Sequence, residues 1–156
     1  MLTVRPTAPN DLEALISWET ERDTSMWLGE TGPAWHARAL ADPDQEHVVA
    51  TDGGTPVGFA VLAGLHRSED VELRRIVIAP ARRGTGRGRA LLQAVLDWAY
   101  QQHGARTVWL DVKKHNHRAR SLYESSGFTE RETHGGATAE PDGTASDLVI
   151  MVHQSR

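Results

Sequence analysis

Two spacings of apolar residues recur along the chain, one typical of strands and the other typical of helices. Short apolar runs bounded by glycine, proline or polar turns predict strands, and apolar residues three and four positions apart predict helices. The expected strands are 2–5, 47–50, 56–65, 71–78, 107–112, one that Phe128 opens, and 147–152. The expected helices are 11–21 with Asn10 as its cap, 33–41, a long helix that holds 91–99 and ends near Gly104, and 116–126, which Gly127 stops.

The order of these elements indicates the class of fold. A hairpin with the turn Asp52-Gly53-Gly54 is followed, in the second half, by strand, helix, strand, helix and strand. The segment 135–143 is polar and is expected to be a loop. This order predicts an α/β fold of the mixed α+β kind, with a central mixed sheet and helices on its faces. No Pro/Gly/Ser-rich linker divides the chain, so residues 1–156 are expected to form a single domain.

Composition excludes several classes of protein. Hydrophobic residues make up 39% and charged residues 24%, which is typical of a globular domain. The chain has no cysteine, which removes disulfides, cysteine metal sites and any acyl-cysteine intermediate. No apolar run approaches the roughly 20 residues of a membrane span, and the N-terminal residues do not resemble a signal peptide. We therefore expect a cytoplasmic protein that does not bind a membrane. The net charge of −4 argues against a general affinity for nucleic acid.

A segment rich in arginine and glycine, 82–89, lies between an expected strand and the start of the long helix. Glycines let the backbone approach a ligand and adopt positive φ, so that successive N–H groups converge on an anion. The positive end of the helix dipole and the arginine side chains add to this attraction. The segment therefore predicts a phosphate or pyrophosphate site.

Other interpretations of this segment fit less well. A P-loop ends in Gly-Lys-Ser/Thr, and the segment has no lysine. A dinucleotide fingerprint requires glycine where Arg89 stands. Two further readings are a nucleic-acid patch and a merely solubilising loop. Both rest on the arginine cluster, which comprises Arg74, Arg75, Arg82, Arg83, Arg87 and Arg89. The glycine spacing favours a phosphate ligand over both.

Two stretches together resemble the GCN5-related N-acetyltransferase (GNAT) family. The first is 76–88, Ile-Val-Ile-Ala-Pro-Ala-Arg-Arg-Gly-Thr-Gly-Arg-Gly, which is similar to the family's strand followed by Arg/Gln-x-x-Gly-x-Gly/Ala. The second is 116–128, Asn-His-Arg-Ala-Arg-Ser-Leu-Tyr-Glu-Ser-Ser-Gly-Phe, which is similar to the family's Asn-x-x-Ala-x-x-Leu-Tyr-x-x-x-Gly-Phe. The resemblance covers roughly residues 46–133 and fits the two ends of the chain loosely.

The resemblance implies a sheet of about seven strands, splayed open between the two motif strands, with the pantetheine arm of acetyl-CoA in the splay. Acetyl-CoA is then the co-substrate, and no metal is involved. The cofactor-binding residues it implies are Ile76, Val77 and Ile78 on the strand; Arg83, Gly84, Thr85, Gly86, Arg87, Gly88 and Arg89 for the pyrophosphate; and Asn116 and Ala119 on the following helix.

Acetyl transfer to an amine requires a base, stabilisation of the carbonyl oxygen and an acid for the departing thiolate. The resemblance implies that Glu72 is the base, with Asp111 as the alternative carboxylate; Glu72 also fits a strand-edge charge. Tyr123 is the implied acid, since a phenol stays protonated at neutral pH, although plain core packing also explains this residue. The backbone N–H of Ile76 is the expected donor to the carbonyl oxygen.

The histidines invite a metal interpretation, because His115 and His117 form a His-x-His pair and His103 precedes them. Such a pair supplies two ligands, and no carboxylate stands at zinc-like spacing. We therefore interpret these histidines as solvated loop residues.

The segment 10–46 indicates an acceptor wall. In the family it tends to border the acceptor site, and here it is acidic and carries Trp18, Trp27 and Trp35, which suits a cationic amine. Two amphipathic helices with solvated faces explain the same charges. The acidic residues are Asp11, Glu13, Glu19, Glu21, Asp23, Glu30, Asp42, Asp44 and Glu46.

Two functions follow from the sequence. The first is an acetyl-CoA-dependent N-acetyltransferase acting on a primary amine of a small molecule, peptide or protein. The second is a non-catalytic acyl-CoA-binding sensor or interaction module. Glu72 and Tyr123 together favour the enzyme. The oligomeric state is open, and a homodimer is among the states compatible with the chain.

Overall fold

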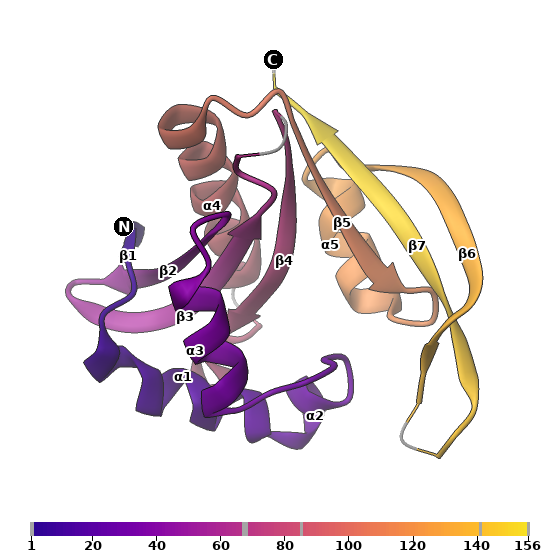
Figure 1. Ribbon diagram of the computed structural model, residues 1–156, viewed down its shortest axis with the longest axis horizontal. Helices are drawn as coiled ribbons and strands as arrows, with labels where there is room; N and C mark the ends of the chain where they lie inside the picture. Colours follow the sequence, from indigo (N-terminus) through magenta and orange to yellow (C-terminus); the bar gives the residue numbers. More distant parts are fainter. Residues whose placement is uncertain (1, 67–68, 85, 141, 156) are drawn as a thin grey trace.

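The computed structural model describes residues 2–66, 69–84, 86–140 and 142–155. Across these ranges the chain forms one sheet of seven strands in the order β1-β2-β3-β4-β5-β7-β6 (Figure 1). Strands β4 and β5 are parallel, and the other neighbouring pairs are antiparallel, which confirms the expected mixed sheet. The strands are β1 Leu2–Pro6, β2 Gln45–Asp52, β3 Thr55–Ala63, β4 Asp70–Ile78, β5 Thr107–Lys113, β6 Thr129–Ala139 and β7 Ala145–Gln154.

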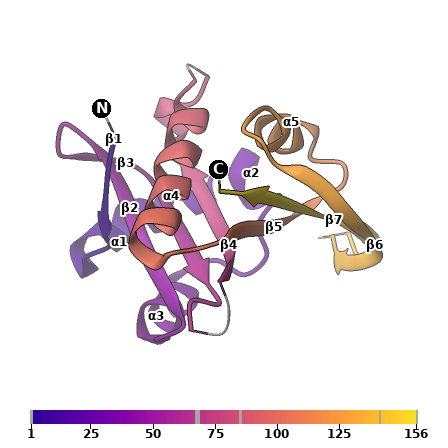
Figure 2. The same ribbon diagram turned by 90° about the horizontal axis from the view of Figure 1, so that it is seen from above.

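Helices cover both faces of this sheet. Figure 2 shows α4 on one side and α3 on the other. None of the helices in the described ranges is long and apolar enough to cross a membrane. The helical elements are η1 Pro9–Asp11, α1 Leu12–Thr20, α2 Arg22–Ser25, α3 Pro33–Ala41, η2 Pro80–Arg82, α4 Arg87–His103 and α5 His117–Ser125.

The alternation of side chains along the strands produces two cores. On β2, Val48 faces the larger core beneath α4, and Val49 faces the smaller core beneath α1 and α3. The buried residues of α4 fall at the spacing that the sequence predicted, and they are Leu91, Leu92, Val95, Leu96 and Ala99. The smaller core is closed by Leu15 of α1 and Ala39 of α3. A site between the sheet and its helices is therefore framed by rigid elements.

The prediction of a loop over 135–143 was wrong in its first half. Strand β6 continues to Ala139, and Thr138 and Ala139 pair with Ser146 and Ala145 of β7. A register irregularity between His134 and Thr138 absorbs the glycines of this stretch. Nearly all of β6 is exposed, so the sequence there carries no apolar alternation and the strand depends on pairing with β7.

The start of the first helix also differs from the prediction. Asn10 lies inside the turn η1 and does not cap α1. The Asp11 carboxylate accepts a hydrogen bond from the Ala8 N–H at 2.7 Å, and the Arg5 guanidinium donates to both its oxygens at 2.8 and 3.0 Å. Together these bonds hold the pKa of Asp11 below its usual range. Asp11 thus anchors the chain to β1 rather than lining an acceptor wall.

Candidate active site

The sheet opens between β4 and β5. Within the described residues these strands pair over Asp70–Glu72 and Thr107–Trp109 and then separate toward α2, as Figure 1 shows. Strand β5 stays paired with β7 along its length, so the whole C-terminal half leans away from β4. A cavity of about 980 Å³ occupies this opening. Its walls come from β4, β5, α2, α5 and the loop that precedes α4.

An extra residue in β4 determines which backbone N–H groups of this strand face the cavity. Leu73 is opposite Leu62 and Arg75 is opposite Val61, so Arg74 forms a bulge. Beyond it, the Ala79 N–H donates to the Val57 carbonyl of β3 at 2.8 Å. Because successive backbone groups point to opposite edges of a strand, the N–H groups of Ile76 and Ile78 face the open edge. All three strand residues that the resemblance implied line the cavity, and Ile76 and Ile78 direct their backbone groups toward it, whereas the backbone of Val77 faces β3.

The arginine- and glycine-rich segment forms the entrance to α4. Gly84 has φ +90° and Gly86, the residue before the helix, has φ +74°, a conformation that residues with a Cβ rarely adopt. A Cβ built on either glycine would have no atom within 4 Å, so both face open space. The predicted residue Thr85 lies outside the described residues. The glycine positions agree with an anion site at the helix N-terminus.

The arginines of this loop divide into two groups. Arg83 and Arg89 line the cavity together with Gly84, Gly86 and Gly88. Arg87 instead pairs with Asp52 of the β2–β3 hairpin at 3.1 Å. Arg83 donates to the Thr24 hydroxyl and pairs with Glu21 at 3.5 Å, so the loop is joined to α2.

Helix α5 brings the second motif to the opposite wall. Asn116 caps the helix, because its side-chain oxygen accepts a hydrogen bond from the Ala119 N–H at 3.2 Å. Both residues line the cavity, as does Tyr123 two turns further along. Tyr123 packs against Phe128, with ring centroids 5.6 Å apart. Burial raises the pKa of Tyr123 to about 12, and the negative charge of Asp111 acts in the same direction. The phenol therefore carries its proton throughout the neutral range.

The two candidate carboxylates share one face of the sheet but meet different surroundings. Glu72 pairs with Arg74 at 2.8 Å, and it is not among the described residues that line the cavity. Asp111 lies two residues beyond the paired part of β5 and does line the cavity. Desolvation raises the pKa of Asp111, and the charge of Glu72 raises it further, against the opposing effect of Arg74. Of the two carboxylates, Asp111 is therefore the one that lines the opening between β4 and β5.

Helix α2, which the sequence did not predict, and the residues that follow it form one wall of the cavity. The helix contributes Thr24, and residues 26–29 contribute Met26 and Trp27. Lys113 of β5 donates to the Met26 carbonyl and to the Glu140 carboxylate, both at 3.1 Å. Trp27 contacts the ring of His115, with centroids 5.0 Å apart. These contacts join the N-terminal segment to the C-terminal half of the sheet across the opening.

Most of the acidic residues that the sequence placed in an acceptor wall lie away from the cavity in the fold. Glu19 is fully buried beside Arg75, and Glu30 pairs with Arg38. Of the three tryptophans, Trp27 lines the cavity, Trp18 packs on the smaller core and Trp35 stacks under Arg75. Asp23 is the residue of the expected acidic set that reaches the described cavity wall. The sequence counted these charges but could not assign their partners.

The histidines take separate places. His115 and His117 both line the cavity, whereas His103 contacts Glu46 at 2.9 Å. In the part of the chain that the structure describes, no three His, Asp or Glu side chains gather in a way that could hold a metal ion.

Comparisons with known proteins agree with this geometry. The family model of the acetyltransferase (GNAT) family matches residues 12–128. The N-alpha-acetyltransferase RimI of Mycobacterium tuberculosis is 35% identical over 130 residues, which cover 78% of this chain and 80% of that protein. The ribosomal protein bS18-alanine N-acetyltransferase of Escherichia coli K12 is 30% identical over 120 residues, covering 75% and 78%.

Solved structures give the same result for the fold. The crystal structure of the ribosomal-protein-S18-alanine N-acetyltransferase from Escherichia coli superposes with a TM-score of 0.78 at 25% identity, covering 99% of this chain and 94% of that one. Spermidine N-acetyltransferase from Vibrio cholerae, in complex with CoA and spermine, has a TM-score of 0.86 at 22% identity, covering 98% and 95%, and supports the fold. The chain therefore belongs to the GNAT family and is an N-acetyltransferase.

Proposed function

We propose that the chain transfers an acetyl group from acetyl-CoA directly to a primary amine that is cationic in solution, on a small molecule, a peptide or a protein. One observation carries this proposal. A single cavity brings together a glycine loop at a helix N-terminus, the open edge of β4, the Asp111 carboxylate and the Tyr123 phenol. These groups supply an anion site, backbone donors, a base and an acid in one continuous space.

The cavity suits acetyl-CoA at both of its ends. The backbone of Gly84, Gly86 and Gly88, with Arg83 and Arg89, would hold the pyrophosphate. The open edge at Ile76–Ile78 would bind the pantetheine arm. Asn116 and Ala119 would border it from α5. The Vibrio cholerae enzyme binds CoA on the same fold, which supports this assignment. Acetyl-CoA supplies the acetyl thioester.

The residues around the centre of the cavity would carry out the two proton transfers of the reaction. Asp111 would take a proton from the ammonium form of the acceptor, and Glu72 would keep the pKa of Asp111 raised toward the range where this transfer is effective. The Ile76 N–H would donate to the carbonyl oxygen as it gains negative charge. The new C–N bond forms as the C–S bond breaks, and Tyr123 would give its proton to the departing thiolate.

The cationic acceptor is supported by the wall that faces these groups. Asp23 and Asp111 supply negative charge, and the ring of Trp27 offers a surface for a cation. The relatives named above act on ribosomal protein or spermidine amines, so both a peptide amine and a polyamine are candidates for the panel below.

The experiment that tests the proposal measures free thiol released from acetyl-CoA in the presence of an amine panel. The panel holds polyamines, aminoglycosides, amino acids and peptides with a free N-terminus or lysine. We expect thiol release that depends on at least one amine and yields its acetylated product. Tight acetyl-CoA binding without amine-dependent release would support a binding module instead.

A variant of the phosphate loop provides the control for this assay. Gly86→Glu places a carboxylate where a phosphate is expected, and acetyl-CoA affinity measured by calorimetry should fall at least about tenfold. Gly86→Asn, which tolerates positive φ and carries no charge, should lose less affinity. Equal affinity in the folded glutamate variant would remove the loop from the cofactor site.

A further inference from the structure

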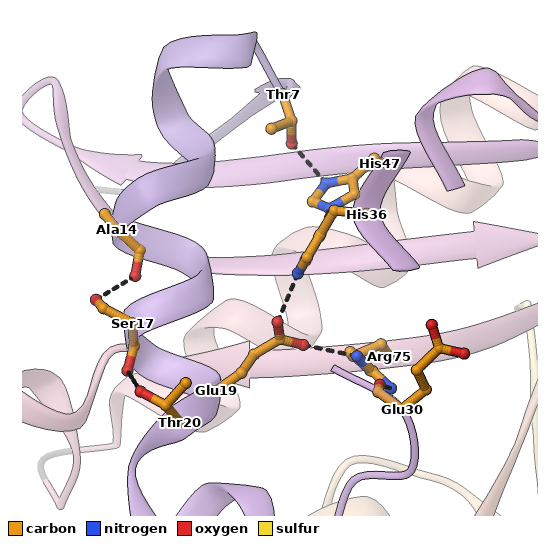
Figure 3. Close-up of polar contacts among 9 residues, drawn as sticks. All are labelled: Thr7, Ala14, Ser17, Glu19, Thr20, Glu30, His36, His47 and Arg75. Carbon is orange, nitrogen blue, oxygen red and sulfur yellow. Dashed lines mark hydrogen bonds and ion pairs between the residues drawn. The ribbon is translucent and has the colours of Figure 1, made fainter. Parts of the chain in front are cut away.

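A chain of buried polar side chains runs between the sheet and the helices α1 and α3 (Figure 3). We call it the Glu19 cluster, and its bonds connect four elements of the fold and the turn that follows β1. Glu19 and His36 are both 0% exposed, so the cluster is isolated from solvent at its centre. Its members are Thr7, His47 of β2, His36 of α3, Glu19 of α1 and Arg75 of β4.

The members of the cluster lie within hydrogen-bond distance of one another along its whole length. Arg75 donates to one oxygen of Glu19 at 2.6 Å, and His36 Nε2 lies 2.5 Å from the other oxygen. His36 Nδ1 lies 2.8 Å from His47 Nε2, and His47 Nδ1 lies 2.8 Å from the Thr7 hydroxyl.

Burial lowers the pKa of His47 to about 4; the charges of His36 and Arg75 act in the same direction, and those of Glu19 and Asp11 oppose it. The cluster thus contains the buried ion pair of Glu19 and Arg75, and the contact of His36 with the other oxygen of Glu19 holds the carboxylate in place.

Arg75 links the Glu19 cluster to the segment that lines the cavity. Its Nη2 atom donates to the Glu30 carbonyl at 2.7 Å, and its guanidinium lies 3.7 Å from the centre of the Trp35 ring. Glu30 directly follows residues 26–29, which line the cavity, and Arg75 itself lines it one residue before Ile76. The far end of that segment is held by Lys113 through the Met26 carbonyl.

The cost of this arrangement argues for a role beyond packing. Burying an ion pair is often no more stabilising than apolar residues of the same volume. The neighbouring residues Leu15 and Phe59 show that the same interface is otherwise closed by apolar side chains. What the charged pair adds is a planar, multiply bonded contact that sets the position of Glu30 relative to β4.

We propose that the Glu19 cluster positions the acceptor wall. Through Arg75 it holds residues 26–30 at a fixed place beside Ile76, so that the amine is presented to the thioester carbonyl in a reactive geometry. This inference rests on the proposed function. Glu19 and Arg75 are positioning residues in it and make no chemical step.

The test uses Arg75→Lys, which keeps the charge beside Glu19 but loses the planar group that also binds Glu30. We expect kcat/KM for the amine to fall by about tenfold to a hundredfold, as a small misplacement of substrate produces. Acetyl-CoA affinity should stay within about twofold of wild type. Amide hydrogen exchange of residues 26–30 should accelerate, while exchange in α4 stays unchanged.

Leu15→Val is the matched control, because it loosens the same interface from α1 without touching Arg75. It should lower stability modestly and leave kcat/KM for the amine unchanged. A loss of activity in Leu15→Val equal to that in Arg75→Lys would reduce the cluster to a stabilising role. Unchanged exchange at 26–30 in Arg75→Lys would overturn the positioning proposal itself.

The exchange measurement also separates this inference from the proposed function. If wild type releases no thiol with any amine but Arg75→Lys still frees residues 26–30, the cluster positions the wall and the proposed reaction is wrong. Should Arg75→Lys fail to fold, Glu19→Asp, which draws the carboxylate back by one methylene, is measured in the same way with the same expected outcome.

Discussion

Replacing Asp111 with asparagine is expected to lower kcat/KM for the amine by about 10²-fold or more near pH 7, within the usual range for a general base. The variant keeps size and hydrogen bonding but cannot accept a proton, so it depends on amine that is already deprotonated. Free amine falls about tenfold for each pH unit below the amine's pKa. The deficit should therefore shrink as the pH rises toward that pKa, in a profile of kcat/KM against pH.

The raised pKa of Asp111 predicts how wild-type kcat/KM for the amine changes with pH. In the proposed reaction Asp111 would act as a base in its ionised form, and its pKa is raised above the ordinary range. Activity should therefore fall as the pH drops through this raised pKa, at a higher pH than an ordinary aspartate would give, and should level off above it.

Glu72→Gln distinguishes the two carboxylates. Removing Glu72 removes a negative charge that raises the pKa of Asp111 and leaves Arg74, which lowers it. If Asp111 is the base, the acid limb of the Glu72→Gln profile should move to lower pH with activity largely kept. If Glu72 is the base, as the resemblance implies, Glu72→Gln should show the steep rise with pH, and Asp111→Asn should run parallel to wild type.

Tyr123→Phe is expected to lower kcat by roughly 10²-fold with little change in acetyl-CoA affinity. The substitution keeps the ring and its contact with Phe128 and removes the proton for the leaving thiolate. A phenol with a pKa of about 12 is protonated at neutral pH, so the proposed acid would be available there. Steady-state kinetics and calorimetry on the same preparation measure the two effects.

Tyr100→Phe is the matched control for this loss. Tyr100 of α4 is also partly buried, and burial raises its pKa to about 12. Its hydroxyl contacts His153 of β7 at 2.6 Å, and neither residue is among the described residues that line the cavity. Its removal should cost some stability and leave kcat unchanged. Equal losses of affinity and stability in Tyr123→Phe, with kcat preserved, would make Tyr123 a packing residue.

The parts of the fold that were predictable are those whose burial shows in the sequence. The apolar spacing of 91–99 indicated the inner face of α4, and the five buried residues of that helix fall within this range. Helix α2 was missed because a single turn, Arg22–Ser25, has no periodic pattern. The extension of β6 was missed because an exposed strand needs no apolar alternation when a partner strand supplies its hydrogen bonds.

The site was predictable where a local motif determines it. Positive φ at Gly84 and Gly86 is a local requirement that the glycine spacing displays, whereas Asn116 was expected inside the helix 116–126 and instead caps it. The choice between Glu72 and Asp111 depends instead on where β4 and β5 separate, which is a property of strand pairing. In the same way, the partnership of Glu19 with Arg75, 56 residues apart, arises from tertiary packing alone.

The initial rate of thiol release, measured over a matrix of acetyl-CoA and amine concentrations, tests the central claim most directly. One cavity that holds both substrates and passes the acetyl group directly between them predicts intersecting lines in double-reciprocal plots. The absence of cysteine from the chain agrees with transfer without an acyl-cysteine. Parallel lines, the sign of a covalent acetyl-enzyme formed before the amine binds, would contradict the account.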